Sequence, residues 1–205
     1  GVQLLPGLKG ETWQSILETA IAVVKMKPDF VRIYPVLVIE NTELADQYRA
    51  GEYEPLSTEQ AITYCAFLKD WFERHNIEVI RIGLQSTEEL DSGNSLVAGP
   101  YEPAMGERVV NEQYKQRIER CINEHIESFI DKELSQWNIW GQVNTYIALN
   151  ISIYYPRSLT SKVRGLKNRN MLYFQEKYPY ININWYEDST RNTVRCCIDG
   201  LQYVL

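Results

Sequence analysis

Apolar residues in the first part of the chain alternate between short β-rich runs and stretches with helical spacing. Short apolar runs rich in β-branched and aromatic residues indicate buried strands, and apolar residues that recur every three or four positions indicate helices. In chain order, the pattern predicts a strand at 2–6, a helix that ends before Pro28, a strand at 30–39 interrupted at Pro35, a helix at 43–49, a helix that follows the capping box at 57–60, and a strand at 77–84.

This order of elements predicts a parallel sheet. Strands that alternate with helices through short connections form right-handed βαβ units. Three parallel strands with two open edges make a poor free-standing sheet. We therefore expect the fold class to be α/β, with these strands forming part of a (β/α) barrel.

The pattern changes in the second part of the chain. Residues 86–106 are predicted to form a loop and 111–136 a long helix. Beyond them the pattern predicts a strand at 145–155, a helical stretch at 158–178 broken near Gly165, and strands at 180–187 and 193–198. We divide the chain into a partial barrel at 1–110, a connecting helix and linker at 111–144, and a small α+β module at 145–205.

Composition and charge refine this division. The 205 residues are 44% hydrophobic and 23% charged, which is typical of globular proteins, and no apolar run approaches the length of a membrane span. Residues 1–156 contain 13 Lys and Arg against 23 Asp and Glu, whereas 157–177 contain six basic residues against one acidic residue. The basic segment is a candidate anion-binding face, although a solvated helix face explains it equally well.

The cysteines and histidines do not form a metal motif. No two cysteines have the spacing at which neighbouring thiolates share a metal, and the histidines, 50 positions apart, lack neighbouring ligands. Four cysteines are also too few for a disulfide scaffold. We expect them to be small buried residues in a reducing cytoplasm: Cys65, Cys121, Cys196 and Cys197.

An ordered series of motifs resembles one family. The sequence LPGLKGET at 5–12 is similar to a strand-to-loop segment late in radical S-adenosylmethionine (SAM) barrels, where GLPGET or GLPGQT is usual. Segments 31–44, 48–56, 79–87 and 97–105 are similar to successive segments of the branch that contains the Elongator catalytic subunit and oxygen-independent coproporphyrinogen III oxidase-like proteins. The resemblance covers residues 1–110, with departures at Lys9 and Glu102.

The resemblance implies a cosubstrate pocket at the strand ends, where (β/α) barrels place their active sites. Its implied SAM-binding residues are Leu5, Gly7, Tyr34, Pro35 and Val36. Leu5 would pack on the adenine, Gly7 would allow close backbone approach, and 34–36 would offer backbone polar groups. Packing in the barrel explains Leu5 and Val36 equally well, and a turn explains Gly7. Arg81 and Gln85 are candidates to face the substrate or the barrel rim.

The family's [4Fe–4S] cluster needs a CxxxCxxC motif, which this sequence lacks. The chain also begins at Gly1 without Met. We therefore expect a C-terminal fragment that is inactive alone, whose partner is the missing N-terminal half of its own barrel. The implied cofactors, SAM and [4Fe–4S], would belong to the full-length protein. The catalytic residues cannot be assigned.

The second module resembles a KH domain, in which a GxxG loop between two helices clamps a nucleic-acid backbone. The similar region is 163–178 followed by 181–184, and Asn168 replaces the second glycine. The implied RNA-binding residues are Lys162, Arg164, Gly165, Lys167 and Arg169.

Two functions follow from these resemblances. The first is a fragment of a radical SAM enzyme, coproporphyrinogen III oxidase-like by resemblance, that supplies part of the cosubstrate and substrate pocket. The alternative is the RNA-binding module of a tRNA-modifying radical SAM protein. Both predict a cytoplasmic protein without a membrane partner.

Overall fold

The computed structural model describes residues 1–84, 95–135 and 149–205. The chain divides into two compact units, residues 1–113 and 114–205, each with its own hydrophobic core. Helix α5 (Met105–Ser135) begins in the first unit and continues into the second. The division predicted from the sequence, into 1–110, 111–144 and 145–205, has three parts instead of two. The prediction assigned the long helix to a separate connecting segment, whereas the structure divides this helix between the two units.

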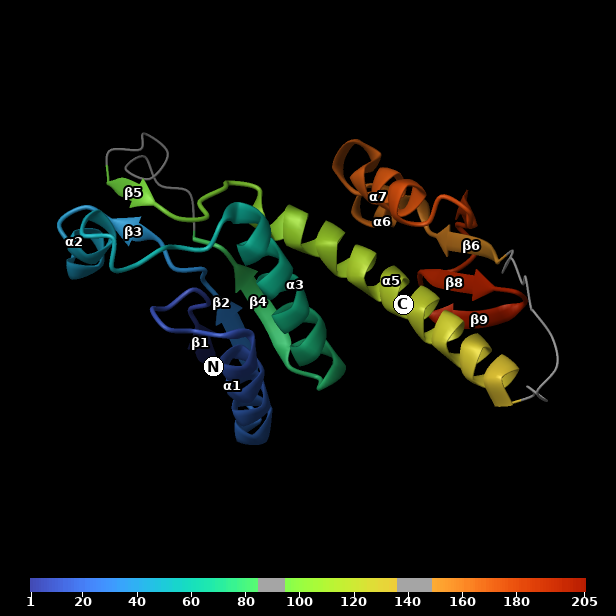
Figure 1. The fold of residues 1–205 in the computed structure, drawn as a ribbon, viewed down its shortest axis with the longest axis horizontal. Helices are drawn as coiled ribbons and strands as arrows, with labels where there is room; N and C mark the ends of the chain where they lie inside the picture. The colour runs from blue at the N-terminus through green and yellow to red at the C-terminus, as the bar shows by residue number, and fades with distance from the viewer. Residues whose placement is uncertain (85–94, 136–148) are drawn as a thin grey trace. The chain divides into compact units, whose positions relative to one another are not determined.

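The first unit contains the parallel sheet expected from the sequence (Figure 1). Strands β1 (Val2–Leu4), β2 (Phe30–Ile33) and β4 (Glu78–Ile82) lie in the order β1-β2-β4, and both pairs are parallel. Helix α1 (Trp13–Met26) connects β1 to β2, and α3 (Thr58–Arg74) lies on the connection from β2 to β4. The mixed α/β class is therefore confirmed.

Local signals set the helix boundaries. Helix α1 begins with a reciprocal capping box between Thr12 and Ser15 and ends at Lys27, whose left-handed conformation stops the helix before Pro28. Helix α3 begins with the predicted capping box, in which the Ser57 hydroxyl accepts from Gln60 N–H and Ser57 N–H donates to the Gln60 side chain. The short helix α2 (Glu43–Arg49) has the predicted bounds.

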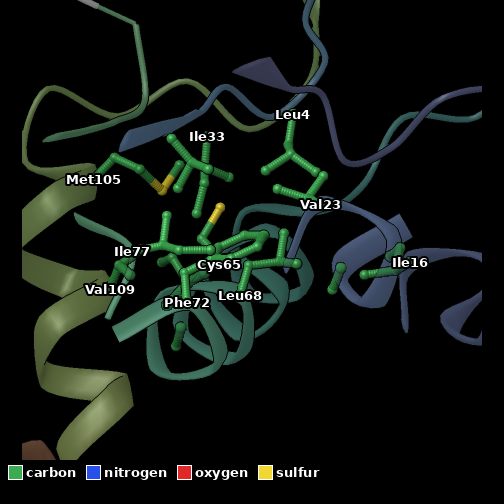
Figure 2. Close-up of a cluster of buried hydrophobic side chains, with 14 residues drawn as sticks. Leu4, Ile16, Val23, Ile33, Cys65, Leu68, Phe72, Ile77, Met105 and Val109 are labelled. Carbon is green, nitrogen blue, oxygen red and sulfur yellow. The ribbon is translucent and has the colours of Figure 1, made fainter. Parts of the chain in front are cut away.

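The core of the first unit lies between the sheet and its helices. Figure 2 shows Phe72 and Leu68 of α3 among side chains that include Ile33 of β2 and Met105 of α5. Phe72 and Ile33 are completely inaccessible to solvent. Burial of these side chains holds the three strand ends in place.

Three sequence predictions for this unit were wrong in detail. The strand expected at 30–39 is two strands, because β3 (Val38–Ile39) leaves the parallel sheet and pairs antiparallel with β5 (Leu96–Ala98). Pro35 has no amide hydrogen with which to continue the ladder. The loop expected at 86–106 contains β5 and the start of α5, so the long helix begins at Met105 rather than near residue 111.

The second unit is a mixed four-stranded sheet with helices on its buried face. The strands are β6 (Asn150–Tyr155), β7 (Asn182–Glu187), β8 (Arg195–Ile198) and β9 (Leu201–Val204), in the order β7-β6-β8-β9. Only β6 and β7 are parallel. Strand β9 was not predicted, and residues 145–148 of the first predicted strand lie outside the described residues.

Two short helices follow β6 on either side of Gly165, as the broken helical pattern predicts. They are α6 (Thr160–Arg164) and α7 (Arg169–Lys177), with 3₁₀ turns η1 (Arg157–Leu159) and η2 (Leu166–Asn168) before each. Their core includes Val163, Phe174 and the inward side chains of the sheet.

No helix among the described residues is long and apolar enough to cross a membrane.

Candidate functional site

Hydrogen bonds hold the loops after β1 and β2 together at the carboxyl end of the parallel sheet. Tyr34 N donates to Leu4 O at 2.8 Å, and Val36 N donates to Pro6 O at 2.9 Å. Gly83 N, just after β4, donates to Ile33 O at 2.9 Å. The three strand ends, at which a (β/α) barrel places its active site, therefore form one connected surface.

Gly7, in the loop after β1, has a conformation that favours glycine. Its φ is +102°, and a Cβ atom there would lie 3.1 Å from Leu56 Cγ and 3.7 Å from Val36 Cβ. Both polar groups of its backbone are held by side chains. Gly7 N donates to Glu11 Oε2 at 2.5 Å, and the buried Tyr53 hydroxyl donates to Gly7 O at 2.6 Å.

The groups that hold Gly7 have shifted pKa values. Burial raises the pKa of the Glu11 carboxyl, and the hydrogen bond from Gly7 N partly offsets this change. Burial also raises the pKa of Tyr53, with a smaller contribution from the Glu11 charge. Tyr53 is therefore a hydrogen-bond donor at neutral pH. Glu11 and Tyr53 also line a hollow of about 210 Å³ beside the 7–10 loop.

The predicted SAM-binding residues lie together at this surface, but their available groups differ from the expectation. Pro35 and Val36 are buried, Tyr34 is half-buried, and the Leu5 side chain is 48% exposed. The amides of Tyr34 and Val36 already donate to Leu4 and Pro6, as described above. Residues 34–36 therefore have only carbonyl groups and side chains with which to contact an adenine.

The predicted substrate-facing residues are placed only in part. Arg81 lies on β4 with its side chain exposed, and Gln85 lies outside the described residues. Sequence reasoning missed Glu11 and Tyr53 as functional candidates. The motif that contains Gly7 also contains Glu11, which is a usable signal, whereas nothing local marks Tyr53.

Comparison with known proteins identifies the first unit. Residues 28–116 match the family described as the radical SAM C-terminal domain. The matched residues make up most of the first unit, residues 1–113. The predicted resemblance to the branch with the Elongator catalytic subunit is thereby confirmed at the level of the family.

Three proteins of archaea are similar to part of this chain. An uncharacterised protein of Methanocaldococcus jannaschii is 39% identical over 64 residues, 31% of this chain and 20% of that protein. A tRNA uridine(34) acetyltransferase of the same organism is 39% identical over 69 residues, 32% of this chain and 13% of that enzyme. The chain thus spans a fifth or less of these relatives. A solved structure, the Methanocaldococcus infernus Elp3 with an N-terminal deletion, has 28% identity and a TM-score of 0.43, covering 56% of this chain and 26% of that one.

Members of the radical SAM family bind SAM and an iron–sulfur cluster, and the described residues of this chain do not suit the cluster. The described residues contain no group of three or more possible metal ligands. Cys65, Cys121 and Cys196 are buried, and burial raises the pKa of each thiol, that of Cys65 to about 12. Cluster ligands must be thiolates, so these cysteines do not fit a [4Fe–4S] site.

Some basic side chains of the segment 157–177 contact other residues of the second unit. Arg164 donates to the Tyr155 hydroxyl, and Lys177 pairs with Glu119 and thereby has a raised pKa. Lys162, Lys167 and Arg169 have exposed side chains. Arg164 and Lys177 therefore contribute to the internal contacts of the unit.

The loop at Gly165 has its own backbone geometry. Gly165 has a φ of +75°, and Lys167 and Asn168 both adopt left-handed conformations. A Cβ atom at Gly165 would lie 2.9 Å from Asn170 Oδ1, and Asn170 Nδ2 donates to Val163 O at 3.0 Å. Local packing alone therefore requires glycine here. The KH-like character predicted for this unit is not confirmed.

Proposed function

We propose that this chain is part of a radical SAM enzyme that modifies a tRNA, and that the loops after β1 and β2 form one wall of its SAM pocket. The match to the radical SAM C-terminal domain supports SAM as the cosubstrate. The relatives named tRNA uridine(34) acetyltransferase support tRNA as the substrate class. The parallel strands β1, β2 and β4 would then be later strands of the family's barrel.

The main structural support for a SAM pocket is the fixed conformation of Gly7 at the strand ends. Glu11 and Tyr53 hold both polar groups of its backbone, so the loop is preorganised without a ligand. The absence of a side chain at Gly7 would permit close approach of the cosubstrate. Leu5 would contact the adenine through its exposed side chain, and carbonyl groups of 34–36 would accept from the adenine amino group.

The cluster would be held elsewhere in the protein, by the family's CxxxCxxC motif. Such a cluster would supply the electron for SAM cleavage. The residues of this chain would position the cosubstrate and exclude water from it. Nothing in the comparisons supports coproporphyrinogen oxidation, which we do not propose. RNA binding by 162–169 stays a prediction, as does the cytoplasmic location.

The test compares two glycines of the same loop in the complete protein. Gly7 and Gly10 both have positive φ angles, but a Cβ atom at Gly10 would meet no atom within 4 Å. We expect Gly7→Ala to weaken SAM binding about tenfold or more, because the Cβ atom crowds Leu56 and the positive φ of the loop disfavours alanine. Gly10→Ala should bind SAM within about twofold of the unsubstituted protein.

Equilibrium dialysis against labelled SAM gives the two affinities, and circular dichroism confirms that both variants are folded. A folded Gly7→Ala protein with unchanged SAM affinity would remove the 5–10 loop from the pocket. Failure of the unsubstituted protein to bind folded tRNA would refute the proposed substrate class separately.

A further inference from the structure

Three side chains form a stacked ladder across the second unit's sheet. Tyr154 of β6 is the direct register partner of Tyr186 on β7 and of Arg195 on β8. The two tyrosine rings stack with centroids 5.2 Å apart and planes 23° from parallel. The Arg195 guanidinium carbon lies 5.5 Å from the Tyr154 ring centroid, and the same guanidinium pairs with Asp188.

This ladder lies on the face of the sheet opposite the core. The alternate residues Ile151 and Ile153 of β6 are fully buried in the second unit's core, so Tyr154 points to the other face. By the same register, Asn182 and Asn184 share the ladder's face with Tyr186. This face is therefore polar and aromatic rather than aliphatic.

The ladder ends at an edge. Strand β7 is the outermost strand of the sheet on that side, and among the residues that the structure describes no strand pairs with its outer edge. Arg195 is 9% exposed and closes the inner end of the ladder, whereas Tyr186 is 46% exposed at the outer end. A planar ring from a ligand that continued the series Arg195, Tyr154 and Tyr186 would therefore stack on Tyr186.

We infer that the Tyr186 end of this ladder binds an unpaired nucleobase of an RNA. Aromatic side chains on open sheet faces stack on bases, and each base has a flat π surface for this contact. The amides of Asn182 and Asn184 add donors and acceptors for base edges on the same face. This inference rests on the proposed RNA substrate and assigns a specific contact to the second unit.

The charge of the second unit as a whole favours RNA over a protein segment. Residues 114–205 contain 12 Lys and Arg against nine Asp and Glu, whereas 1–113 contain nine against 18. The second unit is thus the cationic part of an acidic chain, which suits a polyanion. The site also differs from the glycine loop at 165–168, because it would read bases rather than clamp phosphates.

The experiment measures binding of a fluorescein-labelled oligouridine of about ten nucleotides to the 205-residue chain by fluorescence anisotropy, in about 50 mM salt. We expect Tyr186→Ala to weaken binding about tenfold, the loss of one base-stacking ring. Tyr186→Phe keeps the ring and should restore affinity to within about twofold. Tyr48→Ala, which removes an exposed tyrosine from α2 of the first unit, is the matched control and should have no effect.

A second probe separates stacking from charge. An abasic oligomer of the same length carries the same phosphates without bases, so it should bind the unsubstituted chain and Tyr186→Ala equally. Equal oligouridine affinities of folded Tyr186→Ala and the unsubstituted chain would overturn the inference and leave the edge of β7 to a protein partner. Absence of any oligouridine binding would also overturn it. The proposed function is tested separately, by the binding of SAM and of folded tRNA, so neither outcome decides it.

Discussion

Replacing Gly165 by alanine separates a packing role of this glycine from a role in nucleic-acid binding. The backbone of Gly165 has φ +75° and ψ 161°, a region that is essentially restricted to glycine. A Cβ atom there would also lie 3.0 Å from the backbone nitrogen of Asn170, which is buried. That nitrogen belongs to α7 and cannot rotate away as the end of a flexible side chain can.

The expected destabilisation has two parts. Backbone strain contributes about 1–3 kcal/mol, and forcing a methyl group against Asn170 contributes about 1–3 kcal/mol more. Gly200, in the turn between β8 and β9, is the matched control, because its φ is +87° and no atom lies within 4 Å of its Cβ position. Gly200→Ala should therefore show only the backbone part, about 1–3 kcal/mol.

The measurement is urea unfolding of the chain, with amide hydrogen exchange in β6 and β8 as the readout. Because both strands belong to the second unit, this readout reports on that unit specifically. An m-value of about 1 kcal/mol/M for a unit of this size converts the contact with Asn170 into a midpoint difference of about 1–3 M between the two variants. The reasoning would be refuted if Gly165→Ala and Gly200→Ala unfolded at the same urea concentration. It would then follow that α7 moves to accept the methyl group.

Two further predictions concern titratable groups. Because the folded-state pKa of Glu11 is raised, its contribution makes the first unit less stable as the pH rises from the ordinary carboxyl value through the raised one. Urea unfolding at pH 5 and pH 7 should show a smaller pH dependence for Glu11→Gln, and an unchanged dependence would contradict the assigned cause. Iodoacetamide at pH 8 should label the half-buried Cys197 first and leave Cys65, Cys121 and Cys196 unmodified in the folded chain. Mass spectrometry locates the label, and early modification of Cys65 would show that α3 opens.

Features with local causes could be predicted from the sequence. The capping box at Ser57 depends on Gln60, three positions away, and α3 begins where these residues predict. The parallel pairing of β1 with β2 follows from the alternation of strands and helices. The resemblance to the radical SAM family, which the match over residues 28–116 supports, also rests on ordered local motifs.

Features that depend on distant residues could not be predicted. Pro35 indicated an interruption, but the pairing of β3 with β5 depends on residues about 60 positions later. Strand β9 was missed because three of its four residues are exposed, so it has no buried apolar run that marks a strand in the sequence. The motif containing Gly7 predicted a candidate site, yet the Tyr53 hydrogen bond to Gly7 joins residues 46 positions apart and has no local signal.

That hydrogen bond has a consequence for the order of folding. The 7–10 loop lies near the start of the chain, but the hydroxyl that holds its carbonyl follows α2. Contacts between residues far apart in sequence form after local ones, because closing the intervening chain costs entropy. During synthesis, β1 and α1 emerge well before Tyr53. The loop thus acquires its final conformation only after the segment that follows α2 has docked, among the later events in the folding of this unit.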